Sequence, residues 1–172
     1  MTLSELEKCI FLYGKEIYSF CMQMTENRIE ADELYQDTFL TAVEQLEKLD
    51  ADANPKSYLL SVAIWLWKNR KRKFAWRKRI APIVHLTDEK KNVSEDRGNP
   101  PEDQILLREQ RQMIRQEVNR LEEKYRLPIC LYYMEELSLK EISEILEIPE
   151  GTVKSRLYTA RKILCDKLSF FK

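Results

Sequence analysis

Apolar residues recur every three or four positions along most of this chain, which is the spacing of one buried helix face. The first such stripe, in residues 3–24, is made of large side chains: Leu6, Ile10, Tyr13, Ile17 and Phe20. A second helix is expected to begin near Glu30, with four side chains turned inward: Leu34, Thr38, Val43 and Leu46. The Asn54-Pro55 dipeptide predicts a turn, and because proline is tolerated in a first helical turn, a long helix is expected over residues 55–79.

The helical pattern is interrupted once and then resumes. Residues 81–103 combine prolines, a glycine and mixed charges without a sustained period, which is typical of a linker. The next helix is expected over residues 102–123, with six buried side chains: Ile105, Leu106, Met113, Ile114, Val118 and Leu121. Three further helices are expected over residues 125–136, 139–146 and 150–169.

Composition favours the same fold class. The chain has only three glycines, too few for a sheet-rich fold with many tight turns, and its most frequent residue types favour helix. We therefore predict an all-α fold of two small helical domains joined by a flexible linker. The expected bounds are residues 1–80 for the first domain, 81–103 for the linker and 104–172 for the second domain.

Charge is distributed unevenly along the chain, although the formal net charge is zero. Residues 1–52 hold twelve acids against four bases, whereas residues 53–80 hold nine bases and no acid. An acidic segment followed by a wholly basic one indicates two binding faces for two different partners. Two solvated helix faces are the alternative interpretation.

The residue types that metal and catalytic sites require are scarce. A zinc finger is excluded, because Cys9, Cys21, Cys130 and Cys165 form no CxxC pair and His85 is the only histidine. Each cysteine lies in an apolar helical context and is expected to be a buried thiol. Without a glycine-rich phosphate loop, a metal cluster or a nucleophile–base pair, we expect no enzyme, no cofactor, no metal and no small-molecule substrate. No signal peptide or membrane-length apolar run occurs, so we expect a cytoplasmic protein.

The strongest local signal is a helix-turn-helix over residues 137–161. Ser138 and Glu141 form a capping box for its first helix, and Pro149 separates the two helices. In the second helix, four apolar residues share one stripe: Val153, Leu157, Ala160 and Leu164. The opposite face is polar and aromatic with cations at its edges, which suits the major groove of DNA. The residues expected at DNA are Thr152, Lys154, Ser155, Arg156, Tyr158, Thr159, Arg161 and Lys162. A plain amphipathic hairpin is the alternative.

A second candidate interface is basic and aromatic. Eight of the twelve residues in 68–79 are cationic. In the helix that contains them, one stripe is expected to be buried: Leu59, Val62, Ala63 and Leu66. Ser61, Trp65, Lys68 and Arg72 then fall on the outward face. A tryptophan among cations suits stacking on unpaired bases and neutralisation of phosphates. Core packing is the alternative, most of all for Trp67 and Trp76.

Taken together, these motifs resemble the sigma-70 family of RNA polymerase subunits, specifically its short extracytoplasmic-function (ECF) group. Residues 30–42 resemble region 2.2, with its Asp/Glu-Leu-x-Gln-Asp/Glu-x-Phe core. Residues 58–66 and the basic run resemble regions 2.3 and 2.4, and residues 137–161 resemble region 4.2. The resemblance covers nearly the whole chain, and the Gly-Thr-Val-Lys-Ser-Arg-Leu segment is highly specific.

The resemblance implies three sets of contacts and a regulatory partner. Residues expected on the clamp helices of the largest subunit of core RNA polymerase are Asp32, Leu34, Gln36, Asp37, Phe39 and Leu40. Residues expected to melt and hold the −10 element of promoter DNA are Asp52, Asn54, Lys56, Ser61, Trp65, Lys68 and Arg72. The second domain is expected to read the −35 element and to contact the flap of the second-largest subunit. An anti-sigma factor, often membrane-anchored in this group, is expected as well.

Several positions depart from the family pattern. Trp65 stands where the family commonly has an asparagine that helps to hold a flipped base, so a −10 base preference does not carry over. Glu147 replaces the usual turn glycine, and a non-glycine in a left-handed turn costs about 1 kcal/mol. Ser143 stands in place of a small alanine, Asn69 in place of a common aspartate, and Tyr132 in place of a phosphate-contacting arginine.

A two-domain transcription regulator is the main competing hypothesis. It would use the same helix-turn-helix but would not bind polymerase. The region 2.2-like segment followed by a basic and aromatic helix argues against it, because a simple repressor has no reason to carry that pair.

Overall fold

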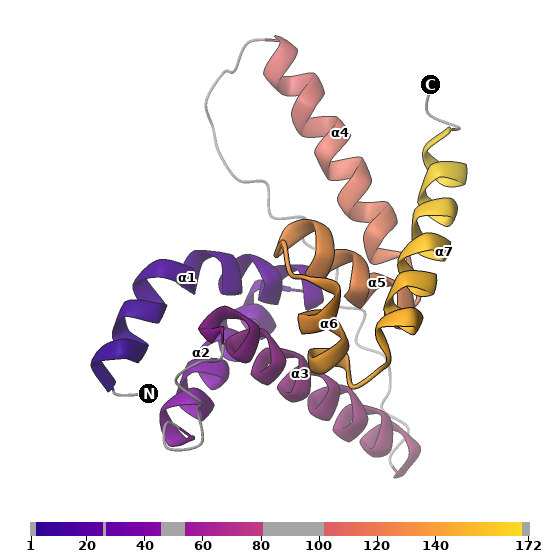
Figure 1. Ribbon diagram of the computed structural model, residues 1–172. Helices are drawn as coiled ribbons and strands as arrows, with labels where there is room; N and C mark the ends of the chain where they lie inside the picture. The colour runs from indigo at the N-terminus through magenta and orange to yellow at the C-terminus, as the bar shows by residue number, and fades with distance from the viewer. Residues whose placement is uncertain (1–2, 26, 46–53, 81–101, 170–172) are drawn as a thin grey trace. The chain divides into compact units, whose positions relative to one another are not determined.

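The computed structural model describes residues 3–25, 27–45, 54–80 and 102–169, with the side chains of 3–5 and 102–106 left out (Figure 1). Every regular element within those ranges is helical, which agrees with the predicted all-α fold class. The chain divides into two compact units, Met1–Asn92 and Val93–Lys172. Most of the predicted linker, residues 81–101, lies outside the described residues, so its bounds stay a prediction.

The first unit consists of three helices that each pack against the other two: α1 (Leu3–Met24), α2 (Arg28–Glu44) and α3 (Pro55–Ile80). α2 begins before Glu30, the expected start, because Asn27 caps it. The Asn27 side chain accepts a hydrogen bond from the Glu30 amide at 2.9 Å, as a polar N-cap residue commonly does.

The core of this unit takes side chains from all three helices. Its fully buried members include Leu6, Ile17, Phe20, Leu34, Leu59, Leu60 and Ile64. Ile10 and Val43, predicted to point inward, are exposed, while their neighbours Cys9 and Ala42 are buried. The phase of each helix is thus set partly by small residues, which a search for large apolar side chains passes over.

A close contact between α1 and α2 explains Gly14, the single glycine in the described part of this unit. A Cβ atom on Gly14 would lie 2.9 Å from the Tyr35 hydroxyl, so a larger residue there forces a shift. The Tyr35 ring is held edge-on between Tyr18 and Phe39, with ring centroids 5.5 and 4.9 Å away. Burial raises the pKa of Tyr35, which keeps this phenol neutral.

The second unit contains α4 (Glu102–Asn119), α5 (Glu123–Ile129), a π-helical turn η2 (Cys130–Met134), α6 (Leu139–Leu146) and α7 (Glu150–Ser169). α4, α5 and α6 all pack against α7. Its core includes Val118, Leu121, Leu127, Leu131, Ile142, Val153 and Leu157.

Three expectations for this unit were wrong in detail. The helix expected to reach residue 123 ends at Asn119, and Ile114, predicted to be buried, is exposed. The helix expected over 125–136 begins at Glu123 and changes to the wider π turn after Pro128, which has no N–H to donate. α6 and α7 have the predicted bounds.

The cysteines differ in their surroundings. Cys9, Cys21 and Cys130 are buried as predicted, whereas Cys165 is exposed, so the prediction for it was wrong. Cys165 follows the buried stripe of α7 by one position, which turns it toward solvent. Burial raises the pKa of the Cys130 thiol to about 12, so it stays protonated and unreactive. None of the described helices is long and apolar enough to cross a lipid bilayer.

The helix-turn-helix has well-defined ends. The predicted capping box is present: the Glu141 amide donates to Ser138 Oγ at 3.2 Å, and the Ser138 amide donates to Glu141 Oε2 at 2.9 Å. α6 ends at Leu146 and is followed by the C-cap residue Glu147, whose φ and ψ of 55° and 43° are left-handed, as predicted from the missing glycine. The Ile148 amide donates to the Ser143 carbonyl at 3.1 Å and closes the turn. Glu136, before α6, has a φ of 56° and was missed by the sequence reasoning.

Replacing either left-handed glutamate by glycine is expected to stabilise the protein. Glu136→Gly and Glu147→Gly each remove a Cβ clash of about 1 kcal/mol. In a domain of this size, that corresponds to a rise of about 4–8 °C in the melting temperature of the second unit. Thermal unfolding followed by circular dichroism measures it.

Glu144→Gly is the matched control, because Glu144 is also exposed but lies inside α6. Glycine in a helix interior should lower stability by about 1 kcal/mol, so the control should shift the melting temperature the other way. If all three variants destabilise alike, the left-handed residues are not strained.

Candidate functional site

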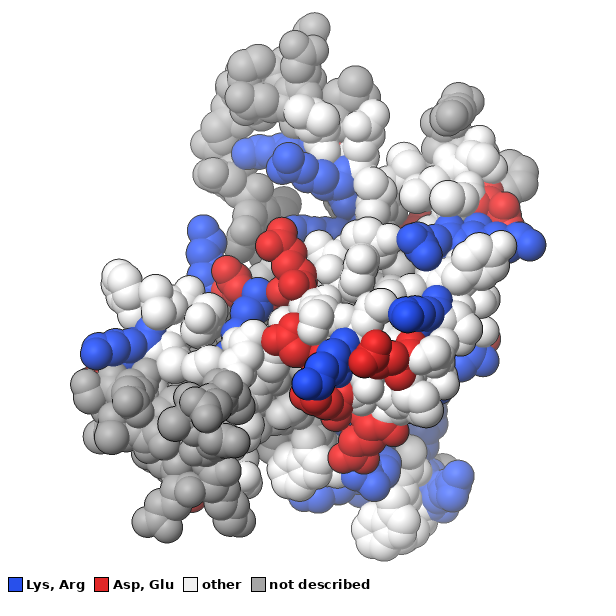
Figure 2. Space-filling view, viewed as in Figure 1, with Lys and Arg blue, Asp and Glu red and all other residues white. Residues whose placement is uncertain are grey.

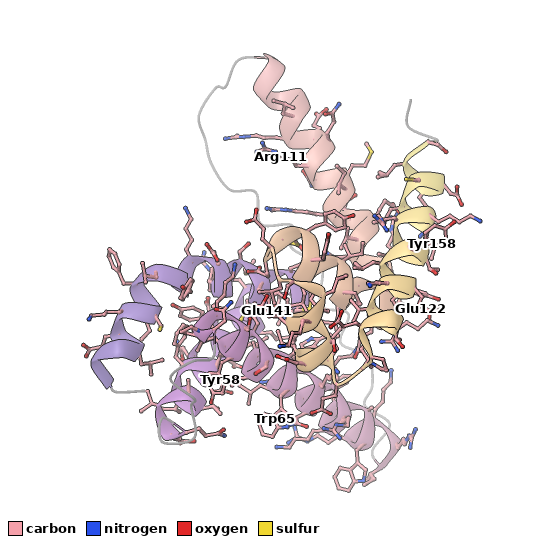
Figure 3. The ribbon with its side chains drawn as sticks, in the orientation of Figure 1. Tyr58, Trp65, Arg111, Glu122, Glu141 and Tyr158 are labelled. Atoms are coloured by element: carbon pink, nitrogen blue, oxygen red, sulfur yellow. The ribbon has the colours of Figure 1, made fainter. Side chains whose placement is uncertain are left out.

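The outward face of α7 carries the residues predicted to contact DNA (Figure 3). Val153, Leu157 and Ala160 are buried and anchor the opposite face, as predicted. On the outward side, Lys154, Ser155, Tyr158, Arg161 and Lys162 are exposed, and Thr152, Arg156 and Thr159 are partly exposed. All eight predicted residues therefore reach the surface of one helix.

Hydroxyl groups on this face are oriented by the helix itself. Ser155 Oγ donates to the Thr152 carbonyl at 3.0 Å, and Thr159 Oγ1 donates to the Ser155 carbonyl at 3.0 Å. Because each hydroxyl has used its proton, its lone pairs remain as acceptors toward an outside donor. The face thus presents oriented acceptors beside the exposed Tyr158 phenol and several cations.

Arg161 is held in place by a residue that the sequence reasoning missed. An Arg161 guanidinium nitrogen donates to the Tyr133 hydroxyl at 3.4 Å, which links α7 to η2. Tyr133 in turn packs edge-on against Tyr132, with centroids 4.9 Å apart. Since the Tyr133 hydroxyl is neutral, this contact orients the guanidinium without cancelling its charge.

Gly151, in the first turn of α7, is not required by the fold. A Cβ atom built there would meet nothing within 4 Å. Glycine in a helix costs about 1 kcal/mol relative to alanine, so this position lowers stability without relieving any contact inside the chain. Space at the N-terminal turn of an exposed helix suits the close approach of an outside group.

The basic part of α3 forms a second polar and aromatic surface. Trp65 and Arg72 are exposed, whereas Ser61 and Lys68 are partly exposed, and Ser61 Oγ donates to the Tyr58 carbonyl at 2.7 Å. For Trp67, the alternative interpretation of core packing is confirmed. Its side chain is buried, and Lys71 Nζ lies 4.5 Å from its ring centroid.

Trp76 is exposed and shares one groove with Trp65. This open groove, of about 540 Å³, is lined by Asp37 of α2 and by Trp65, Leu66, Asn69, Arg70, Arg72, Lys73 and Trp76 of α3. Asn69 accepts a hydrogen bond from the Arg72 guanidinium and orients it. Figure 2 shows Lys and Arg side chains gathered along the lower edge of the view, over the C-terminal half of α3.

The residues expected to hold the −10 element near the start of α3 have other contacts. Asp52 lies outside the described residues, and Asn54 accepts a hydrogen bond from the Lys56 amide at 3.0 Å, which caps the helix. Lys56 Nζ lies 2.5 Å from Glu16 Oε2 on α1, and its side chain is only 14% exposed. Lys56 therefore ties α3 to α1, and its contact with DNA stays a prediction.

Two of the residues predicted to contact polymerase lie inside the first unit. Leu34 is fully buried, and Phe39 is buried against Tyr35. Neither side chain can reach a partner while the unit is folded, so both are corrected to core residues that position α2.

The exposed face of α2 has a different composition from the predicted one. Three apolar side chains, Ile29, Leu40 and Val43, lie exposed on α2 with Glu33 and Gln36 between them along the helix. We refer to these five residues as the α2 surface. Ile29, Glu33 and Val43 were not predicted as interface residues. Ile29 and Val43 could have been found, because they are apolar residues that fall out of phase with the buried stripe.

The acidic residues of α2 are partly neutralised within the chain. Arg70 on α3 places one guanidinium nitrogen 2.5 Å from Asp37 Oδ2 and the other 3.5 Å from Glu33 Oε2. On the α1 side, the Tyr18 hydroxyl donates to Asp32 Oδ1 at 2.7 Å, and this hydrogen bond raises the pKa of Tyr18. These contacts join residues far apart in the sequence, which is why they were not predicted. Among the described residues, no cluster of His, Cys, Asp or Glu could hold a metal ion.

Two family models match the chain. Residues 11–77 match Sigma-70 region 2, and residues 111–164 match Sigma-70, region 4. The first match contains α2 and the basic part of α3, and the second contains the helix-turn-helix.

Curated relatives and solved structures agree with these models. The chain is 34% identical over 161 residues to the ECF RNA polymerase sigma factor SigW of Bacillus subtilis, covering 91% of this chain and 85% of SigW. It is 27% identical over 166 residues to SigM of the same species, covering 95% and 93%.

The fold matches the sigma factor RpoE in its complex with the anti-sigma factor NepR from Bartonella quintana, with a TM-score of 0.80 at 19% identity over 97% of this chain and 98% of that one. It also matches CnrH in complex with the cytosolic domain of CnrY, with a TM-score of 0.70 at 15% identity over 99% and 92%. The chain therefore belongs to the sigma-70 family, as an RNA polymerase sigma factor of the ECF type.

Proposed function

We propose that this sigma factor binds core RNA polymerase through the α2 surface, reads the −35 element with α7 and holds the −10 non-template strand with α3. The observation that carries the proposal is the division of charge and shape among three exposed helix faces. α2 offers apolar and acidic side chains, α3 offers cations and the exposed Trp65 indole, and α7 offers oriented hydroxyls edged by cations. As a member of this family, the chain acts in transcription initiation and is not an enzyme.

Contact with polymerase at the α2 surface is supported by its exposed apolar residues. Ile29 and Leu40 are large side chains that remain mostly exposed in the chain itself. An apolar patch with a polar rim is typical of a protein interface. The pairing of Asp37 with Arg70 means that Gln36 and Leu40, rather than Asp37, are the first residues to test.

Sequence-specific contact at α7 is supported by the free acceptors of Ser155 and Thr159 and by Tyr158. Such groups discriminate base edges, whereas Lys154, Arg156, Arg161 and Lys162 neutralise phosphates. Because phosphate contacts supply much of the affinity, promoter binding should weaken steeply with salt.

Regulation by an anti-sigma factor completes the proposal. Among the solved structures with this fold, the sigma factor RpoE is in complex with an anti-sigma factor, and CnrH is in complex with the cytosolic domain of CnrY. We expect the protein to act in the cytoplasm, held there or at the membrane by such a partner, and to lie at the nucleoid when bound to polymerase.

Introducing a charge into the α2 surface should abolish polymerase binding. Leu40→Arg places a cation in the middle of the apolar patch and should prevent co-elution with bacterial core RNA polymerase in size exclusion. Desolvating that charge against a partner is expected to cost about 2 kcal/mol or more, which lowers the affinity by a factor of about 30 or more.

Ile80→Arg is the control, because Ile80 is 64% exposed where Leu40 is 59% exposed and lies in the same unit on another helix. It should co-elute like the wild type. A wild-type chain that binds duplex DNA alone but ignores core polymerase would support the competing regulator hypothesis instead.

Two substitutions on α7 should affect promoters differently. Arg156→Ala removes a phosphate contact and should weaken transcription from all promoters alike, whereas Tyr158→Ala should change the preference among them by about 1–3 kcal/mol per contacted base pair. Run-off transcription from a set of −35 variants measures both. Equal loss across the set from both variants would contradict the division of roles.

Gly151→Ala should stabilise the protein and weaken promoter binding. The added methyl group is tolerated by the fold and gains about 1 kcal/mol of helix propensity, but it occupies space reserved for the DNA backbone. Thermal unfolding measures the first effect, and promoter binding by the assembled polymerase measures the second. A variant that binds promoter DNA as well as the wild type would show that Gly151 serves no close approach.

A further inference from the structure

Trp76 lies outside the core, and the proposed contacts do not include it. It is 64% exposed near the C-terminal end of α3, where most of a large indole lies in water and gains little from burial. It shares its groove with Trp65, which the proposed function assigns to the unwound strand.

The two indoles lie on the same side of α3. Eleven residues at about 100° each make three turns plus about 20°, so Trp76 returns to the face of Trp65. The rise of about 1.5 Å per residue separates them by about 16.5 Å along the helix. Asn69 and Arg72 fall between them on the same stripe, and both line the groove.

The chemistry of the groove specifies a ligand that is both anionic and flat. Arg70, Arg72 and Lys73 line it, and residues 53–80 hold no acid. Within the described part of the chain, the carboxylate that lines the groove belongs to Asp37, which is paired with Arg70. A nucleic acid supplies phosphates for the cations and base faces for the indoles.

Exposed indoles favour a single strand over a duplex as the ligand. In a duplex, the bases stack on one another and offer only their edges to a protein, whereas unpaired bases offer whole faces to an aromatic side chain. Two indoles separated by cations thus suit two unpaired bases with phosphates between them.

We infer that Trp76 is a second base-stacking platform, which extends the single-strand binding surface of α3 beyond Trp65. The inference rests on the proposed function, since the strand would be promoter DNA. At the duplex rise of about 3.4 Å per nucleotide, the separation of about 16.5 Å corresponds to about five stacked nucleotides, and to fewer in an extended strand. Bases at both ends of such a segment would be held at once.

The test is a fluorescence anisotropy titration of a labelled single strand of about twelve nucleotides at low salt. It is run on the full chain alone and on its complex with core polymerase, with wild type, Trp76→Ala and Trp76→Phe. Trp76→Ala should raise the Kd about fivefold or more, the lower bound for loss of one stacked base, and Trp76→Phe should recover most of the affinity. A duplex of the same length should show no dependence on residue 76.

Phe74→Ala is the matched control. Phe74 is 63% exposed on the same helix, two positions from Trp76 and therefore on the opposite face. It should change the Kd for the single strand less than about twofold. Because both side chains are on the surface, thermal unfolding should be unchanged in both alanine variants.

Three outcomes would overturn the inference. One is an unchanged Kd for the single strand with Trp76→Ala, in the free chain and in the complex. Another is an equal loss for strand and duplex, which would make the groove a phosphate site. The third is competition by an acidic peptide that displaces the labelled strand at a lower concentration than unlabelled strand does. If that competition also depends on Trp76, the groove belongs to a protein partner.

The proposed function can fail separately. A chain that does not co-elute with core polymerase but binds the strand through Trp76 refutes the function and supports the inference. Co-elution without any effect of Trp76 on strand binding refutes the inference alone.

Discussion

The packing of α2 against α3 is the constraint on which the first unit depends. Leu34 and Leu59 are among the side chains buried in its core, and burial of each contributes about 1.5–3 kcal/mol. The Arg70 bridge to Glu33 and Asp37 crosses the same helix pair, but partly exposed ion pairs contribute only about 0–1 kcal/mol. Apolar burial therefore holds the helices together, and the bridge determines which charges stay available outside.

This packing has a functional consequence. Two helices of opposite charge lie fixed in one small body, yet each keeps its own exposed face. Asp37 and Arg70 neutralise each other at the border, so the α2 surface is more apolar than the sequence suggests and the groove on α3 stays cationic. A protein partner and a nucleic-acid partner can then bind the same unit at different faces.

The second unit is less stable than it could be around α7, the helix that we propose contacts DNA. Glu136 and Glu147 hold left-handed conformations that glycine would adopt without strain, and Gly151 weakens a helix that would accept alanine. The two strained residues lie at the ends of α6, where the chain changes direction, and Gly151 lies where α7 begins. A loss of stability is tolerated most readily at positions where the residue type is constrained by the backbone path or by a partner rather than by core packing.

Local signals in the sequence predicted the helix-turn-helix closely. Its capping box, its proline and its apolar stripe act within one or two turns, so α6 and α7 have the expected bounds. Predictions that depend on which way a helix is rotated failed more often. Val43 was expected inside and is exposed, because Ala42 takes the buried position.

The candidate sites show the same division between local and long-range information. The outward face of α7 follows from periodicity, and all of its predicted residues reach the surface. The pairing of Lys56 with Glu16 and that of Arg70 with Asp37 join different helices, so no periodicity in one helix could predict them. The resemblance to the family assigned Leu34 and Phe39 to an interface, but burial assigns them to the core.

We propose that separate faces of this sigma factor bind polymerase and DNA. Hydroxyl-radical footprinting of exposed side chains tests it directly, because the relevant residues are all oxidisable and accessible in the free chain. Core polymerase alone should protect Ile29, Leu40 and Val43, and Trp65 and Tyr158 should become protected only when promoter DNA is added. Protection of Trp65 and Tyr158 by polymerase alone, with Leu40 still reactive, would contradict the account.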